Sequence, residues 1–191
     1  MEKYILYGQI ATFITAIAYL PYIFSIFKIK TKPDRTTWSV LFLIGIITFL
    51  AYRGVGADAT LGVALLNVIG PFTIFILSLK FGEGWNNKND FKYLILSLIA
   101  LILWQIYESP LVGLIFNLIA DFIAFMPTIK KSFSRPWTED LLTWCLFAIG
   151  GIINLFAIEY WRFNIVIYPM YILLAEGGVA IILLWSFFRK K

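Results

Sequence analysis

The 191-residue sequence contains no histidine and only one cysteine, Cys145. The lack of histidine excludes metal sites and proton relays built on imidazole, and one cysteine cannot form a disulfide within the chain. The sequence also has no Cys/His or Ser/His pair for nucleophilic catalysis and no glycine-rich phosphate loop. We therefore expect a protein that is not an enzyme and that has no metal or other cofactor.

Charged residues are scarce at 14% of the chain, whereas 61% of residues are hydrophobic and the mean hydropathy is +0.85. A water-soluble domain of this length cannot bury so much apolar surface. Long apolar runs between charged loops predict membrane-spanning helices instead, each of about 20 residues. No small-residue cleavage site follows the first run, so we interpret it as a retained span. We expect a multi-pass integral membrane protein of a bacterial or archaeal plasma membrane.

One apolar motif occurs twice in the chain. The segment 17–23 (IAYLPYI) returns as 123–129 (IAFMPTI), and the same register continues without a gap as far as Ala51. Chance does not readily match a proline, an aspartate and a Thr-Trp pair in one register, so we interpret the pattern as an internal duplication. The matched pairs include Pro21/Pro127, Asp34/Asp140, Thr37/Thr143, Trp38/Trp144 and Gly45/Gly151.

The duplication predicts an all-α fold with seven transmembrane helices. A three-helix unit starts on one side of the membrane and ends on the other, so two units in the same orientation need one extra crossing between them. We expect a first repeat in residues 1–81, a linker with the fourth helix in 82–109, and a second repeat in 110–191. The predicted spans are about 4–27, 37–53, 57–81, 91–107, 111–131, 140–158 and 164–187.

Lysine and arginine are unequally distributed between the two predicted sides. Only Lys3, Arg53 and Arg162 of the 16 lie on the side of the N-terminus. The positive-inside rule then predicts the N-terminus outside and the C-terminus in the cytoplasm. We interpret the net charge of +5 as topogenic, with basic loops that face lipid head groups, and we expect no nucleic-acid partner.

Two pairs of repeat-related residues mark the predicted cytoplasmic starts of the second and sixth spans. Asp34 and Asp140 precede these spans and are expected to cap their N-termini. Trp38 and Trp144 follow within the first turn. We interpret both tryptophans as part of an aromatic belt at the membrane boundary, with contact to a ligand as the alternative.

The three-helix units resemble the PQ-loop repeat, because each has a proline late in its first helix and then a basic loop, and because Asn67 lies in a third helix. The 3-1-3 arrangement with the N-terminus outside is similar to that of SWEET sugar transporters. SemiSWEETs, PnuC-type vitamin transporters and KDEL receptors have a similar repeat architecture. The signature Pro-Gln is replaced here by Pro21-Tyr22 and Pro127-Thr128. The resemblance implies two bundles around a central site, with substrate held by a residue of each third helix.

Asp121 and Glu176 are acidic residues near the middle of the fifth and seventh predicted spans. No lysine or arginine lies at that depth in any predicted span, so a salt bridge is hard to build. Three interpretations stay open: burial keeps the acids protonated, they line a wet cavity, or they meet a cationic substrate or ion. A neutral carboxyl that bonds to a neighbouring helix is the structural alternative.

Three asparagines complete the predicted substrate site. Aligning residues 65–67 with 174–176 makes Asn67 and Glu176 symmetry mates that face one pocket, with interhelical packing as the alternative for Asn67. Asn117 lies four residues before Asp121 and shares its helix face. Asn154 corresponds to Thr48 in the repeat and is expected to contribute from the sixth span.

Pro21 and Pro127 each remove a backbone hydrogen bond inside a span. We interpret them as a pair of hinges for a gate, with a static kink as the alternative. Their neighbours Tyr19 and Phe125 are interpreted as packing residues, with gating as the alternative.

These features predict an alternating-access transporter for a small polar or cationic solute such as a sugar, an amino acid or a vitamin, with proton coupling as an option. A receptor or assembly protein of the same fold, without transport, is the alternative. The expected partners are the small-molecule substrate and the lipid bilayer, and a homo-oligomer stays open.

Overall fold

The computed structural model describes residues 2–85 and 109–189, with residues 92, 95, 99 and 102 between them. The secondary structure of this part is helical. The predicted fourth span, residues 91–107, falls almost entirely outside the described residues. The helices are α1 (Glu2–Phe27), α2 (Arg35–Gly54), α3 (Leu61–Phe81), α5 (Pro110–Ser134), the 3-10 turn η1 (Pro136–Thr138), α6 (Leu141–Phe156) and α7 (Phe163–Arg189).

The six long helices of the described part coincide with the corresponding predicted helices. The largest shift is at the start of the third span, which was predicted at residue 57 and begins at Leu61. The chain turns here, because Gly56 has a positive φ of 88° and the Leu61 N–H donates to the Asp58 carbonyl at 2.9 Å. The local turn therefore delays the helix by about one turn.

Five of these helices are long and apolar enough to cross a membrane, and α6 is apolar but shorter, at 16 residues. Large apolar side chains lie exposed on the outer surface, including Phe13 on α1 and Leu174 on α7, which are 67% and 68% exposed. An apolar surface of this extent suits lipid and not water. Several long apolar helices with such faces indicate an integral membrane protein.

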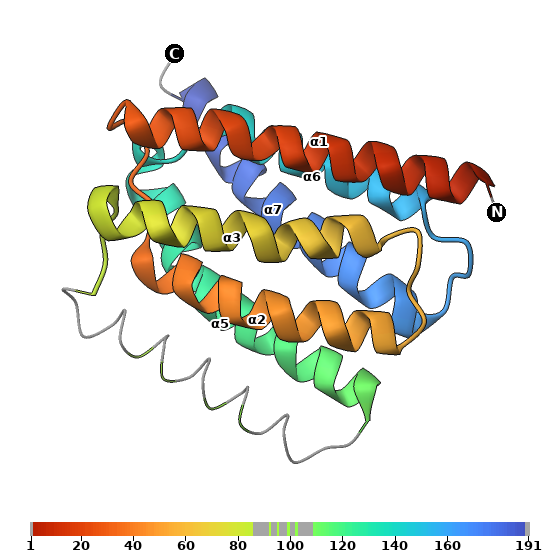
Figure 1. Ribbon diagram of the computed structural model, residues 1–191. Helices are drawn as coiled ribbons and strands as arrows, with labels where there is room; N and C mark the ends of the chain where they lie inside the picture. The colour runs from red at the N-terminus through yellow and green to blue at the C-terminus, as the bar shows by residue number, and fades with distance from the viewer. Residues whose placement is uncertain are drawn as a thin grey trace.

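The helices of each half pack with the third helix in the middle. In the first half, α3 lies against both α1 and α2, and in the second half α7 lies against both α5 and α6. The halves meet where α1 packs on α6 and α2 packs on α5, as Figure 1 shows. Helices related by the sequence repeat therefore have equivalent neighbours. We call the interface between α1–α3 and α5–α7 the seam.

Different segments of the chain lie at the two ends of the bundle. Residues 28–35, 82–84 and 131–140 meet at one end, where the Lys32 N–H donates to the Thr138 carbonyl at 3.1 Å. We call this the basic end. The opposite end holds residues 54–60 and 157–164, together with the start of α1 (Figure 1). As a result, α3 ends at the basic end and α5 begins at the opposite end.

Two aspartates begin α2 and α6 with the same geometry. The Asp34 Oδ1 accepts a hydrogen bond from the Thr37 backbone N–H at 2.8 Å, and the Asp140 Oδ1 accepts one from the Thr143 N–H, also at 2.8 Å. Each carboxylate satisfies an N–H that has no partner within its own helix. The predicted caps are confirmed.

Pro21 and Pro127 lie inside α1 and α5, and both helices continue through them. Neither residue borders the cavity described below. Their role as hinges stays a prediction.

Candidate functional site

A cavity lies at the seam, with a wall to which each of the six long described helices contributes. The centres of water-sized molecules have about 50 Å³ of free space inside it. In this measure one water molecule needs about 10–15 Å³, so the cavity accommodates a few waters or a small solute. Six aromatic side chains form much of the wall: Tyr19, Trp38, Phe125, Trp144, Phe147 and Tyr168.

Three of the predicted site residues come together in this wall. Asn67 from α3, Asp121 from α5 and Glu176 from α7 all line the cavity. Both carboxyl-bearing residues are partly exposed, whereas most of the aromatic neighbours are buried. The residues that line the cavity include no lysine or arginine. A negative charge on either carboxyl therefore has no fixed positive counterpart within the wall.

Asn117 and Asn154 are not among the residues that line the cavity, and their role in substrate binding stays a prediction. At the level of Asn117 the α5 wall is formed by Leu118, which points about 100° away around the helix. Asn117 and Asn154 are buried, at 0% and 1% exposure. Within the described part of the chain, the Asn117 amide and the Asn154 Oδ1 have no hydrogen-bond partner.

Asn67 is held from both sides by tyrosine hydroxyls. The Tyr19 hydroxyl donates to the Asn67 Oδ1 at 3.3 Å, and the Asn67 Nδ2 donates to the Tyr168 hydroxyl at 3.1 Å. The Tyr19 ring fits against α3 at Gly70, where any Cβ would overlap the ring. Because Tyr168 belongs to the second half, Asn67 links the two halves and has both functional atoms of its amide engaged.

The two carboxyls of the wall have different surroundings. The Tyr171 hydroxyl donates to the Asp121 Oδ2 at 2.5 Å, which joins α7 to α5 within the second half. The Glu176 carboxyl has no hydrogen bond or ion pair among the described residues. Glu176 is therefore the more available of the two acids for a solute or a proton.

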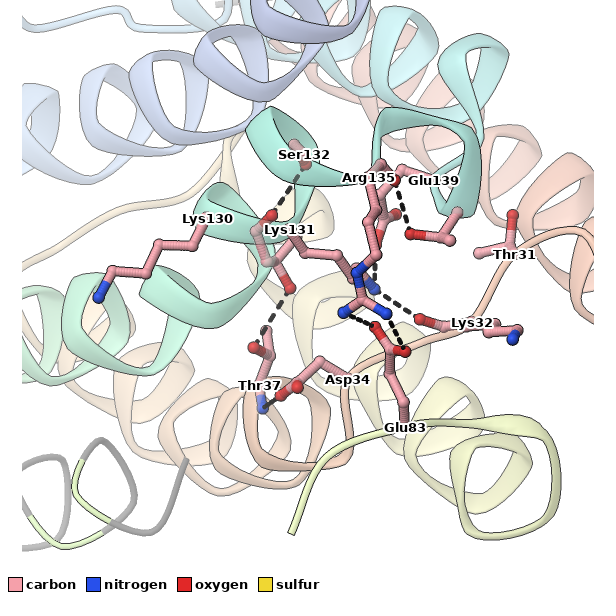
Figure 2. A network of polar contacts seen from close by, with 12 residues as sticks. Thr31, Lys32, Asp34, Thr37, Glu83, Lys130, Lys131, Ser132, Arg135 and Glu139 are labelled. Carbon is pink, nitrogen blue, oxygen red and sulfur yellow. Dashed lines mark hydrogen bonds and ion pairs between the residues drawn. The ribbon is translucent and has the colours of Figure 1, made fainter. Parts of the chain in front are cut away.

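A buried polar network closes the seam at the basic end (Figure 2). The Lys131 Nζ lies 2.6 Å from the Glu139 Oε1, with side-chain exposures of 4% and 0%, and it also donates to the Lys32 carbonyl at 2.5 Å. The Glu139 Oε2 accepts from the Tyr22 hydroxyl at 3.1 Å and from the Trp144 Nε1 at 3.0 Å. Lys32 and Tyr22 belong to the first half and the other three residues to the second, so the network ties the halves together.

An outer ion pair lies beside this network. Arg135 binds Glu83 through two hydrogen bonds of 2.9 and 2.8 Å, as Figure 2 shows, and the two side chains are 49% and 24% exposed. Deeper in the seam, the Thr37 hydroxyl donates to the Ala124 carbonyl at 2.9 Å and accepts from the Thr128 hydroxyl at 3.2 Å. Charged and neutral contacts thus both cross the seam here.

Neutral hydrogen bonds cross the seam at the opposite end. The Tyr52 hydroxyl donates to the Ile165 carbonyl at 2.9 Å, and the Asn164 Nδ2 donates to the Val55 carbonyl at 3.1 Å. The Tyr52 ring also packs on Tyr168, with ring centroids 4.7 Å apart. The cavity therefore lies between an end where charged and neutral groups join the halves and an end where neutral groups join them.

The structure corrects two predictions about residues near the basic end. Trp38 and Trp144 are 3% and 2% exposed and line the cavity, so their assignment to an aromatic belt is wrong. Their recurrence in both sequence copies was a signal for burial at the seam. The assignment of basic loop residues to lipid head groups is wrong for Lys131, which is buried, whereas its neighbour Lys130 is exposed. No feature of the sequence separates these two lysines.

No protein-family model matches the chain, and searches of curated proteins and of solved structures find no match either.

Proposed function

We propose that the protein is an alternating-access transporter for a small polar or cationic solute, such as a sugar, an amino acid or a vitamin. In this proposal seven helices form two parallel three-helix repeats with a linker helix, as in SWEET-like proteins. The N-terminus is outside and the C-terminus is in the cytoplasm of a bacterial or archaeal cell. The single observation that carries the proposal is the cavity at the seam, with Asn67, Asp121 and Glu176 in its wall.

The placement of polar groups supports this function. Charged side chains at membrane depth are expensive and are typical of solute or ion pathways. Both halves contribute to the cavity, so a relative movement of the halves opens it to one side or the other. In one state the network around Lys131 and Glu139 separates, and in the other the bonds of Tyr52 and Asn164 separate. Pro21 and Pro127 supply flexibility in α1 and α5, on the two sides of the seam.

Glu176 is the central residue of the proposed site. Its carboxyl is open to the cavity, and it either pairs with a positive group of the solute or carries a proton that links uptake to pH. Asp121 is the second acid and is oriented by Tyr171. Asn67 positions Tyr19 and Tyr168 in the wall.

Uptake into proteoliposomes that contain the full chain tests the proposal. A panel of labelled sugars, amino acids, vitamins and amines is offered with and without a pH gradient. We expect uptake of at least one class, and we expect Glu176→Gln to reduce it at least tenfold. Glu2→Gln is the matched control, because Glu2 is an exposed acid at the start of α1. Uptake and pH dependence that are unchanged in Glu176→Gln contradict the role of Glu176.

A receptor without flux is the second candidate function. The bond between Tyr171 and Asp121 joins one wall acid to a neighbouring helix, and hydrogen bonds cross the seam at both ends. These contacts favour a core that binds a ligand and stays closed. Saturable binding to the purified protein without uptake into proteoliposomes supports this candidate against the transporter.

A further inference from the structure

The acidic residues of the cavity wall favour a positively charged ligand. Both charged residues in the wall are acids, Asp121 and Glu176, and the lining residues include no basic side chain. A carboxylate at membrane depth is unfavourable unless it is neutralised or paired. A ligand with one positive charge neutralises one carboxylate and lowers this penalty, whereas a neutral ligand leaves it and an anion increases it.

Most polar atoms of the wall that have no hydrogen-bond partner among the described residues can act as acceptors. Tyr171 occupies one oxygen of Asp121, and the Glu176 carboxyl is unpartnered among the described residues. Thr48 also lines the cavity, is 5% exposed, and its hydroxyl has no partner among the described residues. The Trp38 Nε1 is a neutral donor without a partner there, which leaves the charge preference unchanged. These atoms suit a ligand that presents several N–H donors.

The rest of the wall selects an organic cation over a metal ion. Six aromatic rings border the cavity, and the faces of Trp, Tyr and Phe rings attract organic cations. Calcium takes six to eight oxygen ligands and magnesium takes six. The described residues contain no group of three or more acidic or cysteine side chains able to hold a metal ion. A bare calcium or magnesium ion therefore finds too few carboxylate ligands among the described residues.

We propose that the seam cavity binds a small organic monocation of the guanidinium or alkylammonium class. The positive group pairs with Glu176 and with the Oδ1 of Asp121, and the body of the ligand packs between Phe125, Trp144 and the other aromatic rings. The small free volume limits the occupant to a compact molecule. This inference names the substrate class of the proposed transporter, but binding itself does not depend on transport.

Guanidinium and urea form a matched pair of probes, because they have the same planar shape and nearly the same size and differ in charge. The full chain in detergent micelles is titrated with millimolar guanidinium chloride, urea or sodium chloride. Tryptophan fluorescence is one readout, since Trp38 and Trp144 lie in the wall, and the thermal unfolding midpoint is the other. We expect a saturable response to guanidinium at a concentration at least tenfold below any response to urea or sodium. Equal responses to guanidinium and urea overturn the proposal.

Two variants locate the site. Glu176→Gln is expected to weaken guanidinium binding at least tenfold, and Phe125→Leu about fivefold because one aromatic face is lost. Glu2→Gln is expected to bind as the unmodified chain does. If Glu176→Gln does not fold, the comparison of guanidinium with urea on the unmodified chain still decides the question. Unchanged binding in a folded Glu176→Gln variant overturns the proposal.

The results also separate this inference from the proposed function. Guanidinium binding without uptake of guanidinium or of any solute of the panel supports the ligand class and contradicts the transporter. Uptake of a neutral solute together with no guanidinium binding supports the transporter and overturns the ligand class.

Discussion

The buried ion pair between Lys131 and Glu139 is the residue contact with the largest expected effect on stability. Both side chains are almost inaccessible, and removal of one charge leaves the other buried without its partner. We expect Glu139→Gln to lower the free energy of unfolding by about 3–5 kcal/mol. The measurement is the thermal or denaturant unfolding midpoint of the purified chain in one detergent.

The exposed pair between Glu83 and Arg135 is the matched control for this change. It lies at the same end of the bundle, but it joins the two halves and solvent reaches both of its side chains. We expect Glu83→Gln to lower the free energy of unfolding by only about 0–1 kcal/mol. Adding Lys131→Met to Glu139→Gln should recover much of the lost stability, because no charge is then left buried. Similar losses for Glu139→Gln and Glu83→Gln would contradict the burial argument.

At the level of whole elements, the repeat-related glycines of α2 and α6 have different neighbours. A Cβ at Gly45 would overlap the Asn67 backbone carbonyl of α3, whereas a Cβ at Gly151 would lie 3.4 Å from Leu173 of α7. The first contact is with backbone, which cannot rotate away. The second is at an ordinary packing distance. Close approach of α2 and α3 therefore depends on glycine, and the approach of α6 and α7 does not.

This difference predicts opposite effects of the same substitution at equivalent positions. Gly45→Ala should destabilise the chain by about 1–3 kcal/mol, because it forces α3 away from α2. Gly151→Ala should be neutral or should stabilise by up to about 1 kcal/mol, since alanine favours a helix interior over glycine. Unfolding midpoints of the two variants under identical conditions check the prediction. Equal destabilisation of both would show that the two helix pairs pack equally closely.

The elements were predictable from sequence because lipid imposes a length and a composition on each helix. The Asp34 and Asp140 caps followed from local chemistry, since each aspartate acts on an N–H three residues later. Contacts between segments that are far apart in the sequence were harder to predict. Asn67 bonds to Tyr168, 101 residues later, and periodicity within a span does not specify such a partner. Mid-span polarity still identified Asn67, Asp121 and Glu176 as residues that lie apart from lipid.

General rules about membrane proteins mispredicted those residues whose side chains make specific contacts inside the folded chain. Tryptophans near helix ends are usually found at the lipid boundary, but Trp144 turns inward because Glu139 accepts its N–H and Phe147 packs on its ring. Lysines near helix ends usually reach toward head groups. Lys131 turns inward because Glu139 and the Lys32 carbonyl lie within bonding distance. Of these contacts, the one between Lys131 and the Lys32 carbonyl joins segments 99 residues apart, and its formation depends on the complete bundle.

At the scale of the whole molecule, the contacts at the two ends of the seam predict that the halves must separate during transport. Glu83 follows α3 in the first half, and Arg135 follows α5 in the second, so the two residues report the separation of the halves at the basic end. If solute leaves through this end, the residues must move apart in every transport cycle. A covalent link between them should then stop transport while the cavity stays intact.

Cysteines at positions 83 and 135, in a chain with Cys145→Ser, allow this link to be made with thiol-reactive cross-linkers. We expect a short cross-linker to abolish uptake and a long flexible one to leave most of it. Guanidinium binding should be retained in both cases, because neither position lines the cavity. The single-cysteine variants, treated with the same reagents, are the controls. Full uptake with the short cross-linker would mean that the halves do not separate at this end, and the basic-end network would then be a permanent joint and not a gate.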